Sequence, residues 1–217
     1  MILAALWTAT AWRLFNQLSD LDLPLRRVED DVFLAVAWSF FYWLILALAV
    51  LDAEQFWLPD RITVPGIVLG CLVSPIHAAL ALPSTANGPN NTAIHAVALA
   101  LLSNVAGVVL AAGLILLISW AYWLFRHRLG IGLGDAKLMA LLAAWLSLPG
   151  ALLAFGLGVI LGALAALFLL AAPAGRSNTG NWAIKKVPLG TFLCIGGIIS
   201  SFWRGPIIAA YLRWAGL

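Results

Sequence analysis

Long uninterrupted runs of apolar residues are the feature of this sequence that most restricts its fold. Several runs reach the roughly 20 residues that a helix needs to cross a bilayer. A segment in lipid must satisfy its backbone hydrogen bonds internally, and the runs lack the period-2 alternation of a barrel strand. Hydrophobic residues make up 64% of the 217 positions and charged residues 10%. We therefore predict an all-α, polytopic transmembrane helical bundle.

The apolar runs predict seven or eight helices in one membrane domain that covers residues 1–217. The run at 93–125 exceeds a single crossing, so we expect that helix to tilt, kink or extend beyond the membrane. The segment 205–216 is predicted as either a short eighth helix or a surface segment. The other expected spans are 2–18, 33–51, 62–82, 135–148, 150–173 and 188–203.

The positions of Lys and Arg predict the orientation, because short positively charged loops stay in the cytoplasm. The connections between helices form two sets that lie on opposite faces of the membrane. The acidic segment at 20–31 and the neutral loop at 83–91 belong to the set that should face the exterior. This arrangement puts the N-terminus, Asp52 and Asp135 on the cytoplasmic side. The basic connections of the other set contain Arg61, Arg126, Arg128, Arg176, Lys185 and Lys186.

The cysteines and histidines do not suggest a metal site. Cys71 and Cys194 both lie in apolar stretches without a CxxC partner, so they are interpreted as buried small residues. The three histidines lack metal-ligand spacing. We expect no metal, no cofactor and no nucleic-acid partner.

Acidic residues divide between the two predicted membrane faces. Five of the nine lie in the outer segment at 20–31. An aspartate in a span costs roughly 2.5–3.5 kcal/mol on insertion scales, so its place at a span boundary needs a reason. For either aspartate alone, an ordinary helix cap is the simpler interpretation. The four acids at the cytoplasmic face are Asp52, Glu54, Asp60 and Asp135.

The turn before Asp135 contains Gly132 and Gly134, and glycine permits backbone angles and close approach that other residues resist. A substrate backbone could therefore come near this carboxylate. If Asp52 faces Asp135, the two carboxyls should share a proton, one acting as base and the other as acid. Such a pair can activate water against an amide carbonyl.

Three segments carry a resemblance to a known family. Leu51-Asp52 with 58–63 (Leu-Pro-Asp-Arg-Ile-Thr), and then 132–138 (Gly-Leu-Gly-Asp-Ala-Lys-Leu), resemble the type IV prepilin peptidases, which are GxGD membrane aspartic peptidases of the A24 type. The segment 187–192 (Val-Pro-Leu-Gly-Thr-Phe) is similar to the Pro-Phe-Gly-Pro segment of that family, with Leu189 and Thr191 as departures. The resemblance covers about residues 33 to 203.

This resemblance implies that Asp52 and Asp135 are the two catalytic aspartates. Asp60 matches a family position that is not catalytic, and Glu54 and Asp60 could either attract a basic leader or be simply solvated. Lys137 matches the GxGDxK pattern and is expected to hold local structure or to contact lipid phosphates. The remaining motif residues expected to support the site are Gly132, Gly134, Pro188 and Gly190.

The family implies that the substrates are prepilins or type II secretion pseudopilins in a bacterial inner membrane. They are cut at the cytoplasmic face, after a glycine that separates a basic leader from an apolar helix. Many members also methylate the new N-terminus, and these carry an extra helix and a cytoplasmic domain, often with CxxC pairs. The sequence contains neither, and 9–15 resembles the span that follows that domain. The resemblance thus implies an endopeptidase and does not by itself extend to methyl transfer.

Three other functions remain as alternatives. Another GxGD protease would act on preflagellin-like or other short signal segments. A non-catalytic scaffold would keep the fold and lose an aspartate, whereas both are present. A small transporter would place ionisable groups near the middle of its spans, which are almost free of charge here. The oligomeric state stays open.

Overall fold

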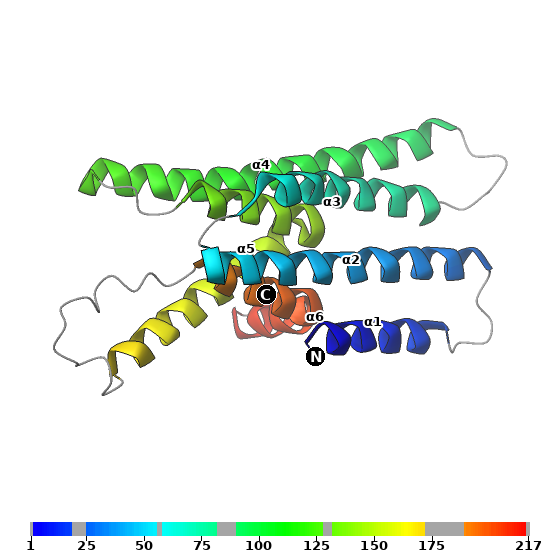
Figure 1. Ribbon diagram of the computed structural model, residues 1–217. Helices are drawn as coiled ribbons and strands as arrows, with labels where there is room; N and C mark the ends of the chain where they lie inside the picture. The colour runs from blue at the N-terminus through cyan, green and yellow to red at the C-terminus, as the bar shows by residue number, and fades with distance from the viewer. Residues whose placement is uncertain are drawn as a thin grey trace.

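The computed structural model describes residues 2–18, 25–55, 58–81, 90–127, 132–171 and 189–215, and these residues are almost entirely helical. They contain no strand, which confirms the all-α prediction. Figure 1 shows six helical elements: α1 (Ile2–Leu18), α2 (Leu25–Gln55), α3 (Asp60–Ala81), α4 (Asn90–Arg126), α5 (Leu133–Ala171) and α6 (Leu189–Ala215).

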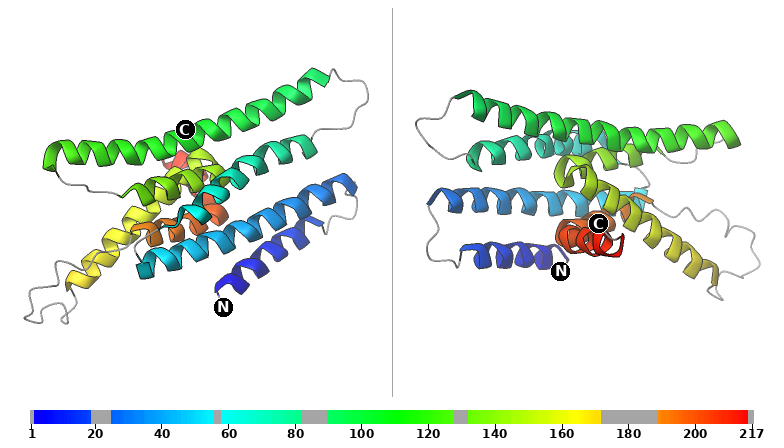
Figure 2. Two further views of the ribbon diagram at one scale, coloured as in Figure 1. Left: turned by 45° about the horizontal axis from the view of Figure 1, so that its top comes forward. Right: turned by 180° about the vertical axis from the view of Figure 1, so that it is seen from behind.

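Four described segments are long and apolar enough to cross a membrane, as predicted. They are Val32–Gln55, Asp60–Ala79, Ile94–Arg126 and Leu133–Phe168. The 37 residues of α4 would span about 55 Å at 1.5 Å per residue, which exceeds the hydrocarbon core of a bilayer. One end of α4 projects beyond the neighbouring helices (Figures 1 and 2), in agreement with the expectation for 93–125.

Two predicted boundaries have different outcomes. The predicted helices 135–148 and 150–173 are the two halves of α5, which is broken at Ser147, where φ is 60° and ψ is 169°. Counting these halves separately gives seven helical segments. The predicted break between 203 and 205 is wrong, because α6 continues through Pro206. Membrane helices tolerate proline where neighbouring groups satisfy the backbone that it leaves unpaired.

The break in α5 is stabilised by polar side chains of two other helices. Asn104 Nδ2 of α4 donates to the carbonyl of Ala144 at 3.0 Å, and Ser200 Oγ of α6 donates to the carbonyl of Gly150 at 2.8 Å. Carbonyls on either side of the break therefore have partners in a region that lacks bulk water. Beyond the break, α5 turns away from its first half (Figure 2), so that its two halves face different neighbours.

The core lies between α2, the first half of α5 and α6. Its fully buried side chains come from all three and from α4, and a hydrogen bond of Trp145 joins them to α3. The rings of Phe41 and Trp145 stack with centroids 5.2 Å apart, and Trp145 Nε1 donates to the Gly66 carbonyl of α3 at 2.9 Å. Tyr42 stacks on Phe202 of α6 at 5.4 Å. These contacts fix the mutual positions of the helices that carry the acidic residues.

Small residues let α5 and α6 approach closely. A Cβ on Gly196 would lie 2.3 Å from the carbonyl oxygen of Ala154, and a Cβ on Gly158 would lie 3.1 Å from the backbone of Leu193. Such contact between backbones is a common way for helices to associate in a membrane. The N-terminal end of α6 is therefore firmly placed relative to α5.

Candidate functional site

Asp52 occupies the last turn of α2 and is buried, with 6% of its surface exposed. Its Oδ2 atom accepts a hydrogen bond from the backbone N–H of Thr191 at 2.6 Å. The Thr191 hydroxyl lies 3.1 Å from the same oxygen and 3.2 Å from the carbonyl of Ala49. The first turn of α6 thus supplies both main-chain and side-chain donors to this carboxylate.

Gly190 lies directly against Asp52. A Cβ at this position would be 2.7 Å from both Cγ and Oδ2 of the aspartate, closer than real Cβ contacts come. The absence of a side chain is therefore what lets the backbone of α6 reach the carboxylate. The structure gives the Gly190 of the predicted motif a definite contact with the predicted Asp52.

Asp135 lies in the first turn of α5 and is partly buried. Its backbone N–H donates to the Gly132 carbonyl at 3.2 Å, which closes the turn before the helix. A Cβ on Gly134 would lie 3.2 Å from Leu58, which is itself buried, so Gly134 lets this turn pack on the segment before α3. A Cβ on Gly132 would meet only ordinary contacts. Of the two glycines, Gly134 has the clearer packing role.

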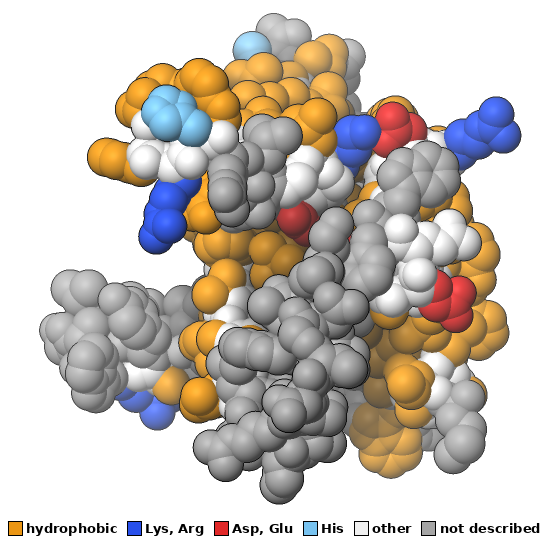
Figure 3. All heavy atoms as spheres, turned by 60° about the vertical axis from the view of Figure 1, so that its left-hand side comes forward, with side chains coloured by type: hydrophobic (Ala, Val, Ile, Leu, Met, Phe, Trp, Pro, Cys, Tyr) orange, Lys and Arg blue, Asp and Glu red, His pale blue; other side chains and the backbone are white. Residues whose placement is uncertain are grey.

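The two aspartates come together at one end of the bundle, where α2 ends and α3, α5 and α6 begin (Figure 1). They are close enough for the charge of Asp52 to act on Asp135. Figure 3 looks toward this end and shows acidic and basic side chains beside apolar ones.

Asp60 and Lys137 form an ion pair beside the aspartates. Lys137 Nζ lies 2.5 Å from Asp60 Oδ1, and both side chains are substantially exposed. The pair joins the start of α3 to the start of α5, and Pro59 accepts hydrogen bonds from the backbone of Ile62 and Thr63 at 3.1 and 3.2 Å. Lys137 therefore has Asp60 as a partner.

Glu54 is exposed two residues after Asp52. The predicted motif residue Pro188 lies outside the described residues, as do Lys185, Lys186, Arg128 and Arg176. In the described part of the chain, no group of three or more His, Cys, Asp or Glu side chains could hold a metal ion.

Thr191 is the site residue that sequence reasoning missed. It stood out only as a departure from the family segment, yet it supplies both donors to Asp52. The two residues are 139 positions apart, so no local pattern could pair them. The available signal was its place in the first turn of a predicted helix, where backbone N–H donors have no partner within the helix.

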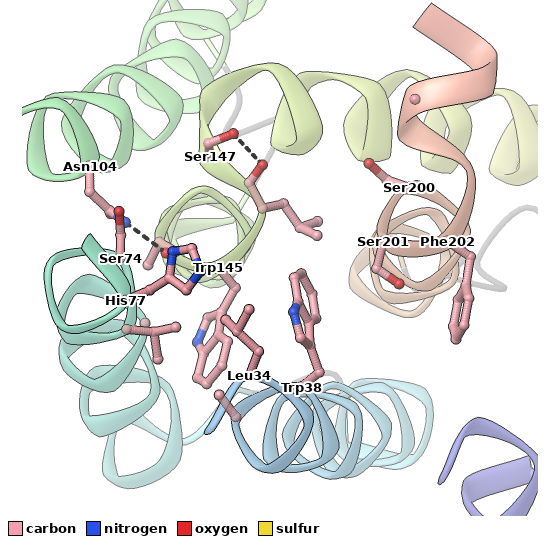
Figure 4. A pocket seen from close by; sticks show the side chains of 16 residues that line it. Leu34, Trp38, Ser74, His77, Asn104, Trp145, Ser147, Ser200, Ser201 and Phe202 are labelled. Atoms are coloured by element: carbon pink, nitrogen blue, oxygen red, sulfur yellow. Dashed lines mark hydrogen bonds between the residues drawn. The ribbon is translucent and has the colours of Figure 1, made fainter. Parts of the chain in front are cut away.

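A separate polar cavity of about 500 Å³ lies farther along the bundle, lined by residues of α2, α3, α4, α5 and α6 (Figure 4). Trp38 on its wall precedes Asp52 by 14 residues, or roughly 21 Å of helix. Asn104 also lines it, and its buried Oδ1 atom has no hydrogen-bond partner among the described residues. The cavity is roomy and polar enough for water, and it does not include the carboxylates.

The chain is similar in sequence to known proteins of one family. Residues 38–167 match the model of the type IV leader peptidase family. The chain is 31% identical to a prepilin leader peptidase/N-methyltransferase of Pseudomonas putida over 189 residues, which are 87% of this chain and 55% of that protein. The protein of that name from Xanthomonas campestris pv. campestris is 31% identical over 178 residues, which are 80% of this chain and 52% of the relative.

The chain spans about half the length of the curated relatives that it matches. No solved structure matches it. The family match covers most of the chain and includes Asp52, Asp60, Asp135 and Lys137. This chain therefore belongs to the type IV leader peptidase family.

Proposed function

We propose that this protein is a membrane aspartic endopeptidase that removes the basic leader of type IV prepilins or type II secretion pseudopilins after a glycine. Support comes from its family and from the names of its relatives. The observation that carries the proposal is the meeting of Asp52 and Asp135 at one end of the bundle, within electrostatic reach of each other.

Two such carboxyls can hydrolyse an amide without a covalent intermediate. One carboxylate removes a proton from water while the other carboxyl protonates the peptide carbonyl, so that the water oxygen bonds to the carbon. Proton transfer to the nitrogen then breaks the C–N bond. No metal or cofactor takes part in the proposed reaction.

We propose that the reaction takes place at the cytoplasmic face of a bacterial inner membrane. Arg61, Arg126 and Lys137 lie on the helix ends around the aspartates, which agrees with the bias of basic residues toward the cytoplasm. A substrate helix embedded in the bilayer would then present its leader at the depth of Asp52 and Asp135.

Glu54 is the residue that we propose attracts the basic leader. It is exposed near Asp52, whereas Asp60 is already paired with Lys137. A carboxylate at a membrane surface attracts Lys and Arg over about a Debye length, which is roughly 8 Å at physiological ionic strength. This attraction should act on substrate binding more than on the chemical step.

The proposal covers cleavage alone and leaves methyl transfer aside. A preflagellin-like substrate for the same two aspartates is the alternative within the enzyme class, and the site chemistry would be unchanged. A non-catalytic scaffold is the alternative outside it. The two aspartates in mutual reach favour an enzyme over a scaffold.

The test is cleavage of a co-expressed pseudopilin in membranes, with the new N-terminus identified by mass spectrometry. We expect the wild type to cut after the leader glycine, and Asp52→Asn and Asp135→Asn each to abolish cleavage while the protein still inserts. Asp60→Asn is the matched control at the same end, and it should retain most activity because an exposed ion pair contributes about 0–1 kcal/mol.

Two results would count against the proposal. Full activity in either catalytic variant would remove that aspartate from the mechanism. A folded wild-type protein that cuts neither pilin-like nor preflagellin-like substrates would favour the scaffold.

A further inference from the structure

We infer that Thr191 is a positioning residue that keeps Asp52 as the ionised member of the pair, so that Asp52 takes the proton from water and Asp135 donates one. This inference rests on the proposed function, because it assigns the two roles within that reaction. It concerns a residue outside the segment of the chain that matches the family model.

The first argument is the direction of the hydrogen bonds at Asp52. The backbone N–H of Thr191 can only donate, and it meets Oδ2 at 2.6 Å. The Thr191 hydroxyl lies 3.1 Å from the same oxygen and 3.2 Å from the Ala49 carbonyl, so its one hydrogen is shared between two acceptors, of which the charged carboxylate is the stronger. Donors aimed at a carboxyl oxygen favour its charged form, and such charge-assisted bonds are stronger than neutral ones. An oxygen that carried the proton would not accept both bonds equally well.

The second argument is the helix that supplies these donors. Thr191 lies in the first turn of α6, whose N–H groups have no partners within the helix and whose dipole favours negative charge. Since Gly190 has no side chain, this positive helix end is in direct contact with the carboxylate. Asp52 thus receives a specific hydrogen bond and a favourable field from one element.

The surroundings of Asp135 differ in the donors available. Asp135 also begins a helix, but its own N–H is directed to the Gly132 carbonyl. Among the described residues, no side-chain hydroxyl donates to its carboxyl. When two nearby carboxyls share one proton, the proton resides on the one with the weaker set of donors. That carboxyl is Asp135.

The proton transfers follow from this assignment. Asp52 Oδ1 receives no hydrogen bond from the described residues, so it is available to take the proton of the attacking water. Asp135 gives its proton to the carbonyl oxygen as the water oxygen bonds to the carbon. Asp52 then passes its new proton to the nitrogen while the C–N bond breaks, and a hydroxyl of the intermediate returns a proton to Asp135. The products are a carboxylic acid and an amine, and both aspartates end as they began.

The substitution that tests the inference is Thr191→Val, which removes the hydroxyl and keeps the N–H and the shape. Loss of a hydrogen-bond donor to the ionised carboxyl of Asp52 makes this ionised form less favourable. We therefore expect the acidic limb of the pH–rate profile to move to higher pH by about one unit, with kcat about tenfold lower below that limb and KM unchanged.

Two further variants serve as controls. Thr191→Ser keeps a hydroxyl and should restore the wild-type profile. Thr10→Val removes a part-buried hydroxyl that bonds only within α1, so it should leave the profile unaltered. An acidic limb that stays in place in Thr191→Val, or that moves equally in Thr191→Ser, would overturn the inference.

A second readout does not depend on any substrate. In the Asp135→Asn background, infrared spectra with and without the further change Asp52→Asn isolate the carboxyl band of Asp52. Adding Thr191→Val should raise the pH at which this band appears by about one unit. An unchanged titration would overturn the role of Thr191, whereas an inactive wild type with the expected shift would count only against the proposed substrates.

Discussion

Gly190→Ala should inactivate the protein without unfolding it. The added Cβ would lie 2.7 Å from Cγ and Oδ2 of Asp52, whereas ordinary contacts begin near 3.4 Å, so the carboxylate or the start of α6 must move by about 0.7 Å. The bond from Thr191 to Asp52 is 2.6 Å long and would be broken or bent by that movement. Alanine also favours a helix over glycine by about 0.5–1 kcal/mol, so α6 itself should not suffer.

The expected loss follows from these two effects. A hydrogen bond to a charged group contributes about 1.5–3 kcal/mol, which corresponds to roughly 10- to 150-fold in rate. Misplacement of a reacting group by about 1 Å can alone cost on the order of 100-fold. We therefore expect kcat/KM for pseudopilin cleavage to fall about 100-fold or more.

The assay is cleavage by purified protein in lipid, with helix content and melting temperature measured on the same samples. The matched control is Gly156→Ala in α5, where an added Cβ meets nothing within 4 Å, and it should cleave like the wild type. If Gly190→Ala cleaves within threefold of the wild type, the close approach of α6 to Asp52 does not matter for catalysis and the reasoning is refuted.

Three other changes should separate binding and packing from catalysis. Glu54→Gln should raise KM several-fold for leaders rich in Lys and Arg with kcat unchanged, and the difference should vanish at high salt, which a salt titration of cleavage can check. Gly196→Ala places a Cβ 2.3 Å from the Ala154 carbonyl, so it should lower the melting temperature and the folded yield, and a normal melting curve would contradict the packing described. Asn104→Leu removes the donor to the Ala144 carbonyl at the α5 break, which should cost about 1–3 kcal/mol of stability in a denaturation series while the folded protein still cleaves.

The helices were predictable because bilayer crossing demands long apolar runs, and these are visible in the sequence. The break in α5 was also expected, since Pro149 follows Ser147 between two runs. The prediction of a break before 205 was wrong. Proline ends a helix in water more firmly than in a packed bundle, and α6 continues through Pro206. Apolar runs thus locate helices well and their interruptions less well.

The site was predictable only where a residue type is unusual at its position in the sequence. Asp52 and Asp135 stood out because carboxylates at span boundaries are costly, and the expectation that they lie at one end agrees with the structure. The contacts that orient them depend on pairs far apart in the chain. Asp60 and Lys137 are 77 residues apart and Thr191 and Asp52 are 139 apart, so these partners emerge only when the helices pack.

The burial of Asp52 has a consequence for the reactivity of the protein when no substrate is bound. With 6% of its surface exposed, this carboxylate is out of reach of a peptide that merely collides with the membrane surface. In the proposed reaction, a substrate must therefore move the start of α6 away from Asp52 before its peptide bond can reach that carboxylate. The proposed peptidase would then be latent at rest and reactive only while a substrate is bound.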